Sequence, residues 1–179
     1  MNKRFLIAAV LIAIASATVG VVAANKQLAP IAPKNTSVAQ LMGLTLSDSK
    51  GQAQKLAQWQ GKFLVVNFWA TWCGPCVQEM PELSALQKEL SGKNVQLLGL
   101  GIDSPANIAE FAKKYQITYP VFSAGMEGTE LSRQLGNQGG GLPFTVLIAA
   151  DGSIAKQYLG RLKMEELRAD IAKLSNVAK

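Results

Sequence analysis

Apolar runs and stretches of helical spacing alternate along most of this 179-residue chain. Residues 63–69 and 95–102 are almost continuously apolar, a pattern typical of strands that are buried on both faces. Residues 105–115 instead place apolar side chains three and four positions apart, which indicates an amphipathic helix. Strands that alternate with helices predict an α/β domain with a mixed central sheet flanked by helices.

Shorter stretches predict the remaining elements of this domain. We expect strands at 44–47, 119–122, 146–149 and 156–159, and helices near 54–58, 76–90, 127–135 and 167–174. The glycine-rich residues 136–141 predict a flexible loop between a helix and a strand.

The N-terminus has a different composition from the rest of the chain. Lys3 and Arg4 precede twenty apolar or small residues, 5–24, enough to span about 30 Å as a helix. This pattern predicts a signal-anchor or signal peptide over residues 1–24, and it places the remainder of the chain outside the cytoplasmic membrane. We favour an uncleaved anchor and expect a tether over 25–40 and the folded domain over 41–179.

The charge balance argues against a nucleic-acid partner. Eighteen Lys and Arg residues against twelve Asp and Glu give a formal net charge of +6. The basic residues form no run with interleaved aromatic side chains, which is the pattern expected of a nucleic-acid surface. We therefore interpret the positive excess as an ordinary solvated surface.

The two cysteines of the chain, Cys73 and Cys76, lie in a Trp-Cys-Gly-Pro-Cys sequence between a predicted strand and a predicted helix. The chain has no histidine, so a four-ligand zinc site and the Ser-His-Asp or Cys-His types of catalysis lack their residues. Haem attachment requires a histidine after the second cysteine, where this chain has Val77. A structural disulfide that closes so short a loop stabilises little. We therefore favour a redox-active dithiol and expect no metal and no cofactor beyond the Cys73–Cys76 disulfide.

The position of this pair predicts which sulfur attacks. The thiolate is the nucleophile, and the unpaired N–H groups at a helix N-terminus favour negative charge there. We therefore expect Cys73 to be the exposed attacking thiol and Cys76, one turn into the helix, to be the resolving thiol. Pro75 suits the first helical turn, and Gly74 leaves room for the backbone of a partner.

Glu79 lies three residues after Cys76 and therefore on the same face of the predicted helix. A partly buried carboxyl there has a raised pKa and can exchange protons with the dithiol. The alternative is an exposed carboxylate that only stabilises the helix N-terminus.

Residues 68–76, together with Glu79, Pro81 and Leu83, resemble the thioredoxin fold, and more narrowly the TlpA/ResA-like group of membrane-tethered thiol–disulfide oxidoreductases. The resemblance extends over roughly residues 40–178. It implies that residues 104–135 contain the βα insertion that this group shares with peroxiredoxins.

The same resemblance assigns functions to residues away from the cysteines. It implies that Leu142 and Pro143 are joined by a cis peptide bond that faces the dithiol, and that substrate backbone docks beside them. Trp72, with Gly74 and Pro75, is expected to complete the docking surface. Asn67 occupies the position at which thioredoxins proper carry a buried Asp, so the resemblance gives the proton-carrying role to Glu79.

These observations predict a reductase of disulfides in exported client proteins. It is expected at the periplasmic or extracytoplasmic face, tethered to the cytoplasmic membrane and recharged by a membrane thiol-electron transporter. One alternative is a thiol peroxidase of the peroxiredoxin type, although its Pro-x-x-x-Thr-x-x-Cys pattern is absent. Another is a non-enzymatic carrier of copper(I), or an assembly factor, that uses the two thiols. No residue pattern identifies the client.

Overall fold

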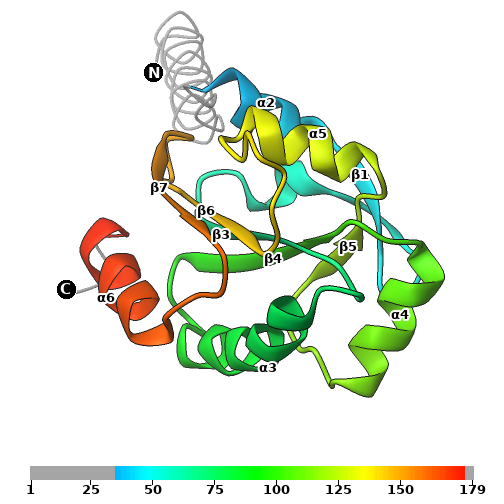
Figure 1. Cartoon of the computed structure of the whole chain (residues 1–179). Coiled ribbons are helices and arrows are strands. Elements are labelled where there is room, and N and C mark those ends of the chain that lie inside the picture. Colours follow the sequence, from blue (N-terminus) through cyan, green and yellow to red (C-terminus); the bar gives the residue numbers. More distant parts are fainter. Residues whose placement is uncertain (1–34, 176–179) are drawn as a thin grey trace, which may run out of the picture. The chain divides into compact units, whose positions relative to one another are not determined.

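The apolar runs become the central strands of a seven-stranded mixed sheet (Figure 1). The computed structural model describes residues 35–175, and the strand order within them is β2-β1-β5-β4-β3-β6-β7. The strands are β1 Thr45–Asp48, β2 Ala53–Lys55, β3 Phe63–Trp69, β4 Val95–Gly101, β5 Val121–Ser123, β6 Phe144–Ile148 and β7 Ile154–Leu159. Strands β3, β4 and β5 are parallel, and β6 runs antiparallel to β3.

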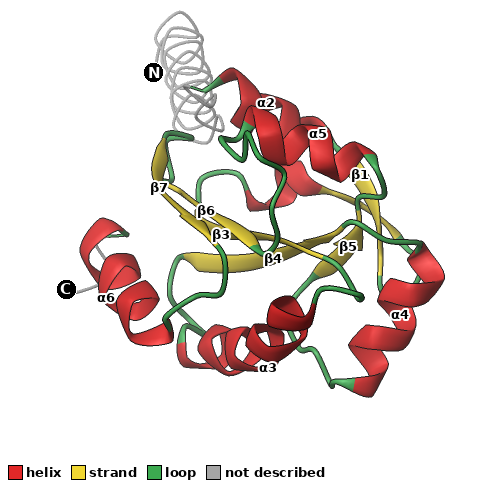
Figure 2. Ribbon diagram, in the orientation of Figure 1, coloured by secondary structure: helices red, strands yellow, loops and turns green. Residues whose placement is uncertain are grey.

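Helices cover both faces of this sheet (Figure 2). They are α2 Thr36–Gly43, α3 Gly74–Glu89, α4 Pro105–Lys114, α5 Glu127–Gln134 and α6 Met164–Leu174, with a 3₁₀ turn η1 at Leu56–Trp59. One face carries α2 and α5, and the other carries α3, α4 and α6. None of the helices within residues 35–175 is long and apolar enough to cross a membrane.

Alternate side chains of β3 enter two separate apolar cores. Val65 and Trp69 pack on the α3 face, whereas Val66 and Phe68 pack on the α2 face. All seven residues of the strand are buried, as its apolar run predicts. The strand that leads to the two cysteines is therefore fixed from both sides.

The predicted α/β architecture is confirmed as a thioredoxin-like fold. Between α4 and β6 the chain adds one strand and one helix, β5 and α5, at the place where the insertion is expected. The helix predicted at 54–58 is wrong, because Gln54 pairs with Leu46 in a short antiparallel hairpin and only a 3₁₀ turn follows.

The predicted tether reaches too far into the chain. The signal segment 1–24 and residues 25–34 lie outside the described residues, but residues 36–40 belong to helix α2. The Asn35 side chain caps this helix by accepting hydrogen bonds from the amides of Ser37 and Val38, at 2.9 and 3.2 Å. The folded domain therefore includes helix α2, and residues 36–40 do not belong to a tether.

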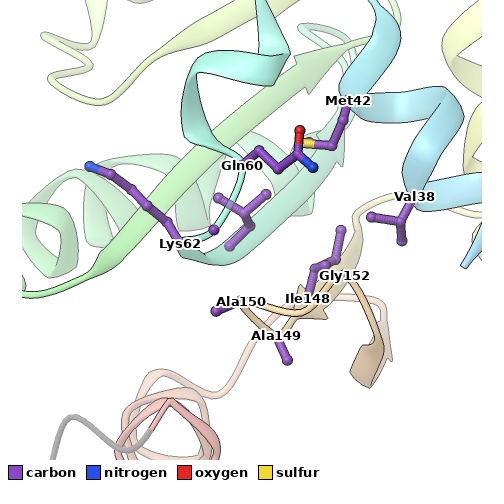
Figure 3. A pocket seen from close by; sticks show the side chains of 10 residues that line it. Val38, Met42, Gln60, Lys62, Ile148, Ala149, Ala150 and Gly152 are labelled. Carbon is purple, nitrogen blue, oxygen red and sulfur yellow. The ribbon is translucent and has the colours of Figure 1, made fainter. Parts of the chain in front are cut away.

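Helix α2 closes the core at the end of the sheet farthest from the cysteines. Val38 and Met42 lie across a small pocket from Ile148, the last residue of β6 (Figure 3). Leu64, near the start of β3, also lines the pocket. The helix is thus part of the hydrophobic core, and the pocket is remote from the dithiol.

The place of α2 in the core predicts an effect on stability. Leu41 is completely buried, so Leu41→Ala should lower the free energy of unfolding by about 2–4 kcal/mol. Its exposed neighbour provides the control, because Gln40→Ala should change that energy by less than about 0.5 kcal/mol. Chemical denaturation measures both. An equally small effect of both variants would show that α2 does not pack into the core.

Candidate active site

The two cysteines lie where β3 gives way to α3. Cys73 is the N-cap of α3, and its sulfur accepts a hydrogen bond from the amide of Cys76 at 3.3 Å. The two sulfur atoms are joined in a disulfide with an S–S distance of 2.09 Å. Pro75 occupies the first turn of the helix, as predicted. The sulfur of Cys73 therefore lies at the N-terminal end of the helix dipole, where an anion is stabilised.

The surface around the disulfide is open, although the sulfurs are mostly covered. Trp72 is 70% exposed, and Gly74 and Pro75 are exposed beside it. Cys73 is only 6% exposed and Cys76 is fully buried, so Cys73 is the more accessible cysteine but less exposed than predicted. Its capping contact explains the difference, because the contact holds the sulfur against the first helical turn.

Glu79 is completely buried, which confirms the predicted burial and excludes the exposed alternative. Its two carboxylate oxygens each receive one hydrogen bond. Asn67 Nδ2 donates to Oε1 at 2.8 Å, and the Leu162 amide donates to Oε2 at 2.9 Å. Burial raises the pKa of Glu79 from 4.5 to about 7, against the lowering effect of these two bonds. A carboxyl with this pKa can take and release protons near neutral pH.

Two groups in the hydrogen-bond network around this carboxyl are not apparent from the sequence. The loop between β7 and α6 supplies the Leu162 amide, and a backbone donor of this kind leaves no trace in a residue pattern. Thr145 accepts a second hydrogen bond from Asn67 Nδ2 at 3.0 Å. Thr145 lies on β6 directly opposite Asn67 on β3, a pairing of distant segments that no local residue pattern indicates.

The segment that precedes β6 has the predicted backbone. The Leu142–Pro143 peptide bond is cis, and Pro143 is buried. Leu142 packs against the core cluster that contains both cysteines. Phe144 pairs with Phe68 near the C-terminal end of β3. Pro143 therefore lies at the end of the sheet where the loop to the cysteines begins. Sequence positions 73 and 143 are thus brought to the same end of the molecule.

A hydrogen bond to Asp103 restrains the loop between β3 and α3, just before the cysteines. The Thr71 hydroxyl donates to the Asp103 carboxylate, which also accepts from Asn107 Nδ2 at 2.6 Å and from the Ser104 amide at 2.7 Å. Partial burial opposes ionisation, but these hydrogen bonds hold the pKa of Asp103 below its ordinary value. Asp103 therefore links the dithiol loop to the end of β4.

No group of three or more His, Cys, Asp or Glu side chains within residues 35–175 is arranged to hold a metal ion.

Sequence comparison shows the same chemistry in relatives. The redoxin family profile matches residues 21–176. The chain is 32% identical over 128 residues to the thiol-disulfide oxidoreductase ResA of Geobacillus thermodenitrificans, covering 69% of each chain. It is 31% identical over 132 residues to ResA of Bacillus cereus, covering 73% of each chain.

Comparison of structures gives the same result for the fold. A thiol:disulfide interchange protein of the thioredoxin family from Chlorobium tepidum superposes with a TM-score of 0.65 at 25% sequence identity. The match covers 73% of this chain and 92% of that one. The chain belongs to the redoxin family and, within it, to the TlpA/ResA-like thiol–disulfide oxidoreductases.

Proposed function

We propose that this protein reduces disulfide bonds of exported proteins outside the cytoplasmic membrane, with Cys73 as the attacking thiol and Cys76 as the resolving thiol. The observation that carries the assignment of roles is the helix cap. The Cys73 sulfur lies at the N-terminus of α3 and accepts the Cys76 amide, whereas Cys76 is fully buried behind it. A thiolate is therefore favoured at Cys73, and only Cys73 is accessible to a client.

The reaction transfers two electrons from the dithiol to the client. The Cys73 thiolate attacks one sulfur of the client disulfide and forms a mixed disulfide with it. The client S–S bond breaks, and the other client sulfur leaves as a thiolate that takes up a proton from solvent. Cys76 then loses its proton and attacks the Cys73 sulfur. The second client thiolate leaves and is protonated, and the Cys73–Cys76 disulfide remains. The client disulfide has then been reduced to two thiols.

Glu79 is the proposed acceptor of the Cys76 proton. Histidine is absent from the chain, so imidazole cannot serve as the base. Glu79 is three residues along α3 from Cys76, on the same helical face, and is fully buried. Its pKa of about 7 matches the task of accepting a proton and returning it near neutral pH.

The client is proposed to dock across the open surface at the dithiol. Trp72, Gly74 and Pro75 are exposed on one side of the disulfide. A Cβ atom added at Gly74 would meet no atom within 4 Å, so the approach of a client backbone is unobstructed there. On the other side, Leu142 and Pro143 would align an extended client segment beside the cis peptide bond.

Features of the sequence support the proposed direction of electron flow and the proposed location. The Gly-Pro pair between the cysteines is the thioredoxin type, which favours a reducing dithiol. Lys3 and Arg4 with the apolar residues 5–24 support attachment to the membrane with the domain outside. A membrane thiol-electron transporter would then restore the dithiol, and no further cofactor is proposed.

Replacing one cysteine at a time should separate the two roles. Cys76→Ser should accumulate mixed disulfides between Cys73 and client proteins, because the resolving attack is lost. Cys73→Ser should trap few or none. Non-reducing electrophoresis of cell extracts, followed by mass spectrometry, measures both. Trapping by Cys73→Ser alone would reverse the assignment.

The reduction potential should identify the direction of electron flow. We expect a value nearer to thioredoxin, about −270 mV, than to the strong oxidant DsbA, about −120 mV. Equilibration of the protein with dithiothreitol or glutathione buffers, followed by thiol counting, gives the potential. A value near −120 mV would indicate an oxidant and reject the reductase.

Glu79 should make the stability of the folded protein fall as the pH rises. The folded protein binds the Glu79 proton more tightly than the unfolded chain, because the pKa is about 7 when folded against 4.5 normally. Between these values stability is therefore lost with increasing pH, by about 3 kcal/mol in total. Glu79→Gln has no such proton to lose, so its stability relative to wild type should rise by that amount from pH 4.5 to pH 8. Parallel pH profiles of the two proteins in chemical denaturation would contradict a buried, titrating Glu79.

A further inference from the structure

Three polar side chains form a chain of hydrogen bonds through the apolar core beside the dithiol. Thr145 on β6, Asn67 on β3 and Glu79 on α3 are linked in that order, and each is at most 1% exposed. They come from positions that are 12 and 78 residues apart in the sequence. These hydrogen bonds connect β6, the strand that follows Pro143, with α3, the helix that contains Cys76.

Asn67 is the central residue of this hydrogen-bonded series, and its Nδ2 atom donates both of the hydrogen bonds. Its amide nitrogen has two N–H groups, and the two acceptors are Glu79 Oε1 at 2.8 Å and Thr145 Oγ1 at 3.0 Å. Both donors are therefore used, and the position of Thr145 determines how the amide faces Glu79. Asn67 and Thr145 are directly opposed in the β3–β6 pair, so the strand register maintains this geometry.

A purely structural side chain at position 67 would not require an amide. Its neighbours in β3 are all apolar or aromatic, and its Oδ1 atom has no hydrogen-bond partner among the described residues. Burying an unpaired polar atom costs free energy that an apolar residue of the same size avoids. The amide therefore serves the two groups to which it donates, and the ionisable one of these is the Glu79 carboxylate.

We propose that Asn67, oriented by Thr145, is a positioning residue that holds the Glu79 carboxylate toward the dithiol and stabilises its ionised form for proton transfer from Cys76. This inference rests on the proposed role of Glu79. The ionised carboxylate accepts the proton as the Cys76 sulfur attacks Cys73, and the client thiolate is released. The carboxyl proton then returns to solvent or to the departing thiolate, which restores the acceptor.

Other ionisable side chains also affect the charge of Glu79, and their effects can be distinguished from that of Asn67. Arg161, in the loop before α6, favours the ionised form, and Glu82 on the same helix opposes it. The buried Tyr119, which precedes β5, and Cys76 on α3 lie in the same core region. Asn67 differs from these residues because its side chain donates directly to the carboxylate.

The test is a two-step oxidation of the reduced protein by 5,5′-dithiobis(2-nitrobenzoate) in a stopped-flow instrument. The first equivalent of thionitrobenzoate reports attack by Cys73, and the second reports the resolving attack by Cys76. The rate of the second step is measured from pH 5.5 to pH 9 for the wild type, Glu79→Gln, Asn67→Leu, Thr145→Val and the double variant Asn67→Leu/Glu79→Gln.

In the wild type, the second step should show a rise centred near pH 7 that Glu79→Gln removes. In Asn67→Leu, loss of a hydrogen bond to a charged group should move this rise upward by about one pH unit. The second step should then be up to about tenfold slower at pH 6.5 and nearly unchanged at pH 9. Thr145→Val should shift the rise in the same direction by less, and it provides the test if Asn67→Leu fails to fold.

The double variant separates positioning from a general structural effect. Asn67→Leu should slow the second step by less than twofold when Glu79 is already Gln, because its target is gone. Ser84→Ala is the matched control, since Ser84 is a buried hydroxyl on the same helix that bonds the Thr118 amide instead. It should leave the pH profile unmoved.

Three outcomes would overturn the inference, and they separate its own failure from failure of the proposed function. If Asn67→Leu and Thr145→Val keep the wild-type profile, or slow the step equally at every pH and in the Glu79→Gln background, positioning by Asn67 is rejected while the role of Glu79 stands. If the wild type shows no rise that depends on Glu79, both the proton role of Glu79 and this inference are rejected. If the second equivalent is never released, the exchange mechanism itself is wrong.

Discussion

The carboxyl group of Glu79 lies in the apolar core, and it is accommodated there because two donors reach it from distant parts of the chain. One donor comes from β3 and the other from the loop between β7 and α6. Burial alone favours the neutral acid, whereas the two hydrogen bonds favour the carboxylate. Their opposition brings the pKa close to neutral, where a proton carrier is most useful. The pKa of Glu79 therefore depends on how the sheet, α3 and this loop are packed relative to one another.

The dithiol depends on the same packing. Strand β3 is buried on both faces and delivers the chain to the start of α3, where Cys73 caps the helix. The loop between β3 and α3 is also restrained by the hydrogen bond from Thr71 to Asp103, which follows β4. The helix N-terminus then favours a thiolate at Cys73, and the core behind it keeps Cys76 buried. This geometry supports the proposed attack by Cys73 and the proposed resolution by Cys76.

Much of this arrangement is readable from the sequence. The strands and the helix that begins near Cys73 follow from apolar runs and helical spacing, and the cis bond at Pro143 follows from family resemblance. Helical spacing places Glu79 on the same face as Cys76 but leaves open whether its carboxyl is buried or exposed. The contributions of the Leu162 amide and of Thr145 cannot be read from the sequence. Each depends on a contact between distant residues, separated by 83 positions for Leu162 and Glu79 and by 78 positions for Thr145 and Asn67. Helix α2 is missed, because the composition of residues 25–40 as a whole is typical of a tether. The capping Asn35 and the spacing of Val38, Leu41 and Met42 are the local signals that indicate the helix.

The central claim is that a buried carboxyl beside the dithiol changes its charge near neutral pH. Its most direct test is a carbon-13 NMR titration of glutamate side-chain carboxyls in the intact protein, with the Glu79 resonance assigned by its loss in Glu79→Gln. The account predicts a titration midpoint near pH 7 for this resonance. A midpoint near the ordinary value of 4.5 would contradict it, because the carboxyl would then be permanently ionised at neutral pH and hold no proton to return.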